Sequence, residues 1–276
     1  MKIAVVTTFN DKLYHEYAQN FLQSFYKHCS FDLYVYSEEP IWLREEDKRE
    51  KLTVYNTYDE IPSCKGFVDR HKDDKFLPPS KFKTSKKYAY LFNDYKSFRH
   101  MAVRFSYKVY AYSDFILNKA DGYDAVIGLD ADTLFFNTLD ENFIKTHIHK
   151  DKTMMAYLGR GYTQGGRKYH SECCFLYFNL KHEQTQNYLA DMKKYYDHDL
   201  IYEIAEQHDS FVWDHVRQEY EKTRGVLNHN IGDKRVAHVQ ARSCLAKVFD
   251  HLKGRITKER GYSLENKYAA KAKKGN

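Results

Sequence analysis

Apolar runs and amphipathic segments alternate along the first part of the chain. The β-branched run KIAVVTTF at residues 2–9 is typical of a central strand in an α/β sheet. Apolar residues then recur at helical spacing over residues 15–29, which predicts an amphipathic helix packed on that sheet. The runs FDLYVYSEE at 31–39 and KLTVYNTY at 51–58 predict two further strands. The chain therefore opens with a βαβ arrangement.

The same alternation resumes after an interruption. Residues 64–98 hold two prolines and many lysines, which predicts a long surface excursion and a candidate lid over an active site. A helix without proline or glycine is predicted next, at residues 96–120. Further strands are predicted at 124–136, 153–159 and 173–180, and helices at 183–197 and 209–223. We expect one α/β domain over residues 1–266, with a mixed, mostly parallel central sheet and helices on both faces.

Composition agrees with a soluble globular protein. The chain has 276 residues, of which 42% are hydrophobic and 30% charged. No run approaches the roughly 20 apolar residues of a membrane span, and the N-terminus turns polar too early for a signal peptide, so we expect a cytoplasmic protein. The five cysteines lack the CxxC spacing of zinc or redox motifs and are interpreted as free, buried thiols.

Positive charge is concentrated at the C-terminus. The formal charge is +6, and four of the lysines lie in residues 267–276. Without them, 40 of the 44 basic residues face 38 acidic ones, so the body of the protein is near neutral. This balance argues against a specific nucleic-acid binder. We expect a disordered basic tail at 267–276, which leaves open a weak contact with a membrane.

The stretch DAVIGLDADTLFF at residues 124–136 places two acids inside an apolar run. Residues two apart in a strand point to the same side, so Asp130 and Asp132 present both carboxylates together. Burying such a pair without a cation costs several kcal/mol or forces one carboxylate to take up a proton. The pair therefore predicts a positive partner, most simply a divalent metal, although two acids also commonly cap a strand end. Oxygen ligands suit Mg²⁺ or Mn²⁺, and an added imidazole favours Mn²⁺.

Two enzymatic interpretations fit the pair. In a phosphohydrolase of the haloacid dehalogenase type, the first aspartate attacks phosphate and both bind Mg²⁺, but that motif normally lies on the first strand. At least three predicted strands precede it here. In the second interpretation, the metal bridges the diphosphate of a nucleotide sugar and stabilises the leaving group.

Six segments, in order, resemble the glycogenin-like glycosyltransferases, retaining enzymes of family 8 with the GT-A fold. AVVTTFNDKLY resembles the first strand and donor loop, FSYKVYAYS resembles the helix that carries a donor-binding lysine, and LDADTLFF resembles the metal strand. CCFLYFNL is similar to a later strand of the family, EQHDSFVWD to its Asp-Gln turn by the transferred sugar, and HLKGRITK to the closing segment. The resemblance implies a nucleotide-sugar donor, a UDP-sugar by default, and a divalent metal.

The resemblance also implies residue roles. The nucleotide and its phosphates would contact Thr7, Thr8, Asn10, Tyr14, Lys108, Asp130 and Lys258. The metal would bind Asp130, Asp132 and His251, and Asp209 would lie by the sugar. The sequence departs from the family pattern at Glu172 and Cys174, which replace its Asn and Gly, and at Ser210, which replaces the Gln of its Asp-Gln turn. The closing lysine is shifted by one position, and the Pro-Trp that follows is missing. The donor end therefore matches better than the acceptor end.

Alternatives remain at single positions. Lys108, four residues after Arg104, is also typical of a solvated basic helix face. His238 competes with His251 as a metal ligand. Glu172 or Asp209 acting as a general base on the acceptor would make the enzyme inverting, whereas in the retaining course of the family both orient sugar hydroxyls.

These observations predict a glycosyltransferase, with a retaining course favoured, acting on a carbohydrate, lipid-linked or protein acceptor. The alternatives are the Mg²⁺-dependent phosphohydrolase and a non-catalytic module that binds nucleotide with the same fold.

Overall fold

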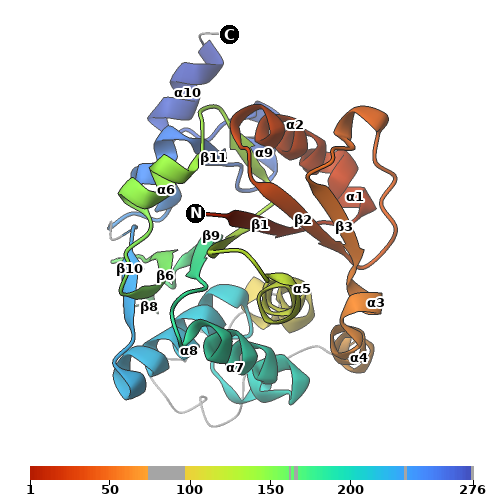
Figure 1. The fold of residues 1–276 in the computed structure, drawn as a ribbon, viewed down its shortest axis with the longest axis vertical. Helices are drawn as coiled ribbons and strands as arrows, with labels where there is room; N and C mark the ends of the chain where they lie inside the picture. The colour runs from red at the N-terminus through yellow and green to blue at the C-terminus, as the bar shows by residue number, and fades with distance from the viewer. Residues whose placement is uncertain (74–96, 162, 165–166, 233–234, 275–276) are drawn as a thin grey trace.

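A computed structural model describes residues 1–73, 97–161, 163–164, 167–232 and 235–274 (Figure 1). Its centre is a seven-stranded sheet with the strand order β10-β6-β9-β4-β1-β2-β3. These strands are β1 (Ile3–Thr8), β2 (Asp32–Ser37), β3 (Leu52–Asn56), β4 (Ala125–Leu129), β6 (Thr153–Leu158), β9 (Glu172–Asn179) and β10 (Leu227–Asn230). Only β9 runs antiparallel to its neighbours, β4 and β6. The predicted α/β fold with a mostly parallel sheet is confirmed.

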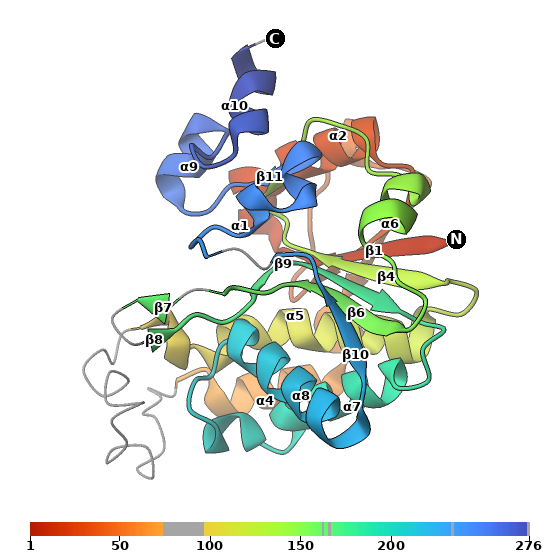
Figure 2. The ribbon, with the colours of Figure 1, turned by 90° about the vertical axis from the view of Figure 1, so that its left-hand side faces the viewer.

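Helices cover both faces of the sheet (Figure 2). One face carries α4 (Pro62–His71), α5 (Ala102–Asp114), α7 (Thr185–Asp197) and α8 (Asp209–Arg224), and the other carries α2 (Gln19–His28) and α6 (Glu141–His147). The short helices are α1 (Asp11–Leu13), α3 (Thr57–Glu60) and α9 (Arg255–Arg260). None of the helices in the described ranges combines the length and apolar character needed to cross a bilayer.

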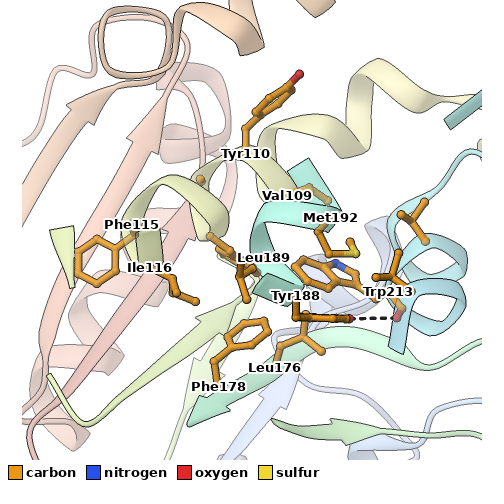
Figure 3. Packing of buried hydrophobic residues seen from close by; sticks show 14 of the residues in the cluster. Val109, Tyr110, Phe115, Ile116, Leu176, Phe178, Tyr188, Leu189, Met192 and Trp213 are labelled. Carbon is orange, nitrogen blue, oxygen red and sulfur yellow. Dashed lines mark hydrogen bonds between the residues drawn. The ribbon is translucent and has the colours of Figure 1, made fainter. Parts of the chain in front are cut away.

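Alternating side chains of the central strands enter two separate cores. Ala4 and Val6 of β1 belong to the core under α5, α7 and α8, whereas Ile3 and Val5 belong to the core under α2 and α6. In the first core, Trp213 packs among aromatic and aliphatic side chains (Figure 3). Because both faces are buried, the strands appear in the sequence as continuous apolar runs.

A second, two-stranded sheet positions the end of the chain. It pairs β11 (Phe249–His251) antiparallel with β5 (Thr133–Phe135), which begins just after the aspartate pair. A β-hairpin of β7 (Thr163–Gln164) and β8 (Arg167–Lys168) lies between β6 and β9 in the chain.

Two sequence expectations change, and a third is confirmed. The predicted excursion at 64–98 begins inside helix α4, where Cys64 and Phe67 are fully buried, and its residues 74–96 lie outside the described part of the chain. The helix predicted at 96–120 is α only over Ala102–Asp114 and continues as a π-helical turn, Phe115–Lys119. The five cysteines are free, as expected; three of them are buried, whereas Cys29 and Cys244 are only partly buried.

The basic tail is a helix, so the expected disorder of residues 267–276 is wrong for the described residues. α10 spans Lys267–Lys274, and Ala269 within it is buried. The Asn266 side chain accepts hydrogen bonds from the backbone N–H groups of Tyr268 and Ala269, which caps the helix. Its amide donates to Asp250, which anchors the cap to β11. The lysines alternate with alanines, the best helix formers, and composition alone hid this propensity.

Gly128 of β4 lets helix α5 approach the sheet closely. A Cβ atom at this position would lie 2.3 Å from Cε2 of Tyr112, whose ring is fully buried. This contact sets the distance between α5, which carries Lys108, and the strand that leads to the aspartates.

We predict that Gly128→Ala lowers the free energy of unfolding by about 2 kcal/mol, because the buried Tyr112 ring has no room to move away. Urea unfolding followed by circular dichroism measures the change. The control is Gly66→Ala in α4, where the new Cβ has its nearest neighbour at 3.6 Å, in Arg70. That variant should keep or slightly raise stability, because alanine favours a helix by up to about 1 kcal/mol. Equal stability of Gly128→Ala and the natural protein would contradict the tight approach.

Candidate functional site

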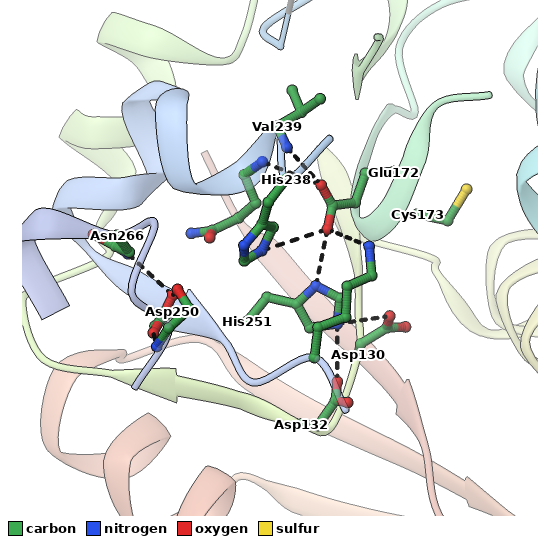
Figure 4. Close-up of polar contacts among 12 residues, drawn as sticks. Asp130, Asp132, Glu172, Cys173, His238, Val239, Asp250, His251 and Asn266 are labelled. Carbon is green, nitrogen blue, oxygen red and sulfur yellow. Dashed lines mark hydrogen bonds and ion pairs between the residues drawn. The ribbon is translucent and has the colours of Figure 1, made fainter. Parts of the chain in front are cut away.

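Asp130 and Asp132 follow β4, at the edge where the parallel strands β1 and β4 both end (Figure 4). His251 lies between them, with Nε2 3.2 Å from Asp132 Oδ1 and 3.7 Å from Asp130 Oδ2. The aspartate side chains are 23% and 18% exposed, and His251 is buried. One ligand atom from each residue lies within 4.8 Å of the others. The structure thus brings together the three residues expected to bind a metal.

The small sheet explains why a histidine so late in the chain reaches these aspartates. In the β5–β11 pair, His251 lies opposite Thr133, the residue that follows Asp132. The backbone N–H of Leu252 donates to the carbonyl of Asp132 at 2.8 Å, which extends the ladder by one bond. Register, and not a flexible loop, therefore places the imidazole.

Two lysines flank the aspartates. Lys108 Nζ is 2.5 Å from Asp130 Oδ1 and 2.9 Å from Asp209 Oδ2, and the Lys108 side chain is only 14% exposed. The alternative that Lys108 belongs to a solvated helix face is therefore wrong. Lys258, in helix α9, places Nζ 3.1 Å from Asp132 Oδ2.

These cations hold the two carboxylates in different electrostatic environments. Burial raises the pKa of Asp132, but His251 and Lys258 outweigh it, and the pKa falls well below its ordinary value. Burial also raises the pKa of Asp130, and the attraction of Lys108 and His251 does not fully offset burial and the repulsion from Asp132. Carboxylate and imidazole donors at this spacing fit Mn²⁺ or Mg²⁺.

Glu172, at the start of β9, lies on the side of His251 opposite Asp132 (Figure 4). Its side chain is 2% exposed, and Oε1 lies 3.1 Å from His251 Nδ1 and 2.8 Å from Lys253 Nζ. Oε2 accepts the backbone N–H groups of Val239 and Gln240. Burial raises the pKa of Glu172, but these contacts, led by His251, bring it well below the usual range. A buried carboxylate with a low pKa and both oxygens engaged does not suit a general base; it suits the orientation of His251.

The competing ligand, His238, lies near the same carboxylate oxygen of Glu172 as His251 does. Its Nε2 lies 3.6 Å from Glu172 Oε1, and its ring is 5.9 Å from the ring of His251, centroid to centroid. His238 is thus grouped with Glu172 and His251, whereas the aspartates are grouped with His251 alone.

The four residues expected to contact the nucleotide differ in burial. Thr7 and Tyr14 are fully buried. The Tyr14 hydroxyl donates to Asp47 at 2.6 Å, and the Asn10 side chain caps helix α1 by accepting the N–H of Leu13. With the half-buried Thr8, these four residues line neither of the cavities that contain the aspartates. That Thr7, Thr8, Asn10 and Tyr14 contact the nucleotide stays a prediction.

Tyr17, three residues after Tyr14, faces one of these cavities. It lies in a π-helical turn, Tyr14–Ala18, whose wider winding changes which residues face outward. Lys258 Nζ lies 3.8 Å from the centre of the Tyr17 ring, a cation–π contact. Tyr17, Lys258 and Asp132 line a cavity of about 430 Å³. The only sequence signal for Tyr17 was its position one turn after Tyr14.

A larger cavity of about 830 Å³ lies on the side of Asp130. Lys108, Asp209, Glu172 and His251 line it. Sequence reasoning missed several further lining residues, among them Arg99, Arg160, His170, Glu206, His208 and Lys253. The aspartate pair therefore stands at the boundary of two cavities, with one carboxylate on each.

Comparison with known proteins supports the fold. No protein-family model and no curated protein matches the sequence. The crystal structure of apo mouse xyloside xylosyltransferase 1 is similar over 83% of this chain and 85% of that one, with a TM-score of 0.50 and 12% identity. Galactosyltransferase LgtC, in complex with donor and acceptor sugar analogues, is similar over 78% and 70%, with a TM-score of 0.41 and 14% identity. The GT-A type of fold is confirmed, and membership of family 8 stays a prediction.

We predict that Glu172→Gln lowers the free energy of unfolding by about 3 kcal/mol at pH 7, because Lys253 and the buried His251 lose their counter-charge. A folded-state pKa below the unfolded value of about 4.3 means that the stabilisation is complete above that value and is lost as pH falls through the folded pKa. Urea unfolding at pH 7 and at several values below pH 4 measures both effects.

The control is Glu183→Gln, which changes an exposed glutamate and should leave stability unchanged within about 0.5 kcal/mol. A Glu172→Gln variant as stable as the natural protein at pH 7 would contradict the prediction. So would a stability difference that stays constant as acid is added.

Proposed function

We propose that this chain is a glycosyltransferase, which uses a divalent cation, Mn²⁺ or Mg²⁺, to transfer a sugar from a nucleoside-diphosphate donor to an acceptor hydroxyl. One observation carries the proposal: Asp130, Asp132 and His251 converge at the boundary of two cavities, with Lys108 and Lys258 at their flanks. The fold agrees with it, since the GT-A arrangement places ligand sites at the carboxyl ends of the parallel strands.

The leaving group explains the charges. A cation held by Asp130, Asp132 and His251 would neutralise the diphosphate as its bond to the sugar breaks. Lys258 contacts Asp132 and can turn to a phosphate oxygen at the same place, where its charge stabilises the same group. His251 keeps its orientation through Glu172, so that one imidazole nitrogen always faces the aspartates.

The two parts of the donor, nucleoside and sugar, occupy different cavities in this proposal. We place the nucleoside in the smaller cavity, where the Tyr17 ring offers an aromatic face. The sugar then lies in the larger cavity beside Lys108 and Asp209. Uridine as the base follows from the family resemblance alone. The acceptor, a carbohydrate, lipid-linked or protein hydroxyl, enters through the larger cavity.

The surroundings of the two carboxylates favour a retaining course. Asp209 is paired with Lys108, and Glu172 is bonded through both oxygens. Burial raises the pKa of Asp209, but Lys108 and His208 lower it below its ordinary value. Neither carboxylate is a strong base, and a leaving phosphate oxygen then takes the acceptor proton.

The phosphohydrolase alternative fits the contacts less well. Its nucleophile would be Asp130, whose carboxylate is bound by Lys108. The motif follows β4, the fourth strand along the chain, with β1 on one side and the antiparallel β9 on the other.

We predict that one nucleoside diphosphate or nucleotide sugar stabilises the protein only when Mn²⁺ is present, because the metal bridges it to the aspartates. At 100 times the dissociation constant, the gain is about 2.7 kcal/mol. Thermal melting with a panel of nucleotides, with and without Mn²⁺, measures it.

Asp132→Asn should lose this stabilisation, and Asp121→Asn, which changes an exposed aspartate, should keep it. Stabilisation that survives Asp132→Asn would place the nucleotide elsewhere. Stabilisation by simple phosphate esters alone would favour the phosphohydrolase. Metal-dependent nucleotide binding without turnover on any acceptor would favour a non-catalytic module.

A further prediction concerns stereochemistry. The transferred sugar should keep the anomeric configuration that it has in the donor, because neither Asp209 nor Glu172 suits the role of base. Proton NMR of the first product formed measures the configuration. An inverted product, together with a loss of about 100-fold or more in rate in Glu172→Gln, would instead establish Glu172 as the base.

A further inference from the structure

A second group of metal-type side chains lines the larger cavity, apart from the aspartate pair. His208 Nε2 lies 2.8 Å from Glu206 Oε2, and His170 Nε2 lies 3.5 Å from Glu206 Oε1. Glu206 is 1% exposed and His208 is also buried. One ligand atom from each of the three lies within 4.8 Å of the others. His170 lies two residues before β9, and Glu206 and His208 lie just before α8.

Each imidazole stands between two carboxylates. His170 Nδ1 lies 3.8 Å from Asp214 Oδ2, and His208 Nδ1 lies 4.0 Å from Asp209 Oδ1. Metal-binding histidines commonly show this arrangement, with one ring nitrogen toward the ion and the other toward an outer carboxylate that fixes the tautomer. Asp214 is itself held by the backbone N–H and hydroxyl of Ser171 and by Arg217.

Both Nε2 atoms are directed at the same carboxylate, that of Glu206. The outer contacts, at 3.8 and 4.0 Å, are longer than hydrogen bonds and leave each Nδ1 facing a carboxylate without binding it closely. Arg99 already places Nε 3.4 Å from Glu206 Oε2. With a metal ion at the two Nε2 atoms, each ring stays neutral, keeps its proton on Nδ1 and still faces the outer carboxylate with a donor.

We propose that His170, Glu206 and His208 form a binding site for a divalent transition-metal ion, with Zn²⁺ as the best fit. Two imidazoles and one carboxylate are a common zinc ligand set in sites that keep a further position for water or substrate. All three residues line the larger cavity, so a hydroxyl or a water molecule within it can reach the ion. The site is distinct from the oxygen-rich aspartate pair, which suits Mg²⁺ or Mn²⁺.

The proposal is independent of the glycosyltransferase assignment, because it concerns metal binding and needs neither nucleotide nor acceptor. If Zn²⁺ does not bind, the proposal for the aspartate pair is unaffected. The two proposals are tested with different ions and different variants.

The test uses the full chain after treatment with a chelator, in an Asp132→Asn background that weakens binding at the aspartates. Isothermal titration with ZnCl₂ measures stoichiometry and affinity, and titration with CoCl₂ reports tetrahedral coordination through its visible absorption bands. We expect one ion per chain. His170→Gln and His208→Gln, each missing a ligand, should weaken binding by more than about 100-fold, since loss of an outer partner alone costs 10- to 100-fold.

A matched control is His238→Gln, which removes a histidine from the Glu172 group in the same cavity and should leave the Zn²⁺ affinity unchanged. Circular dichroism melts verify folding, and Glu206→Gln serves as a third ligand variant if one histidine variant does not fold. Absence of Zn²⁺ binding, or equal affinity in the folded ligand variants, would overturn the proposal. Loss of binding in His238→Gln would also overturn it, by placing the ion at Glu172.

Discussion

The repulsion between Asp130 and Asp132 is the constraint around which this end of the molecule is organised. Two carboxylates at the end of a buried strand need positive charge within a few ångströms. The chain supplies it from three separate places: Lys108 on α5, His251 on β11 and Lys258 on α9. Each of these elements must dock before the pair is neutralised, and docking of each is favoured by that neutralisation.

Docking depends on features that lie away from the charges. Gly128 lets the Tyr112 ring lie against the strand, which brings α5 close enough for Lys108 to reach Asp130. The β5–β11 ladder fixes His251, and Asp250 in that same ladder binds the segment leading to α10 through Ser263 and Asn266. Removing one charged partner from such a buried group leaves an uncompensated charge, which costs more than the pair itself contributes. The fold and the site are therefore stabilised together.

The sequence predicted the features that depend on the local pattern of residues. It missed those that depend on which face a helical residue presents and on contacts between residues distant in the chain. Apolar periodicity located the strands, and the spacing of two acids located the site. Tyr14 was chosen because its segment resembles the donor loop of the family. A π-helical turn brings Tyr17 to the cavity, and no residue pattern predicts such a turn. The contacts of Glu172 come from residues that are distant in the chain, so its role could not be read from neighbours in the sequence.

Asp209 connects the two groups of charges in the larger cavity. One of its oxygens pairs with Lys108, which also binds Asp130, and the other lies 4.0 Å from His208 of the second group. A cation that enters either group changes the charge facing this shared carboxylate. If the two affinities differ with the other site filled, thermodynamic linkage requires the factor to be the same in both directions. The shared aspartate thus gives the cavity a physical route by which a cation bound at one group acts on the other group.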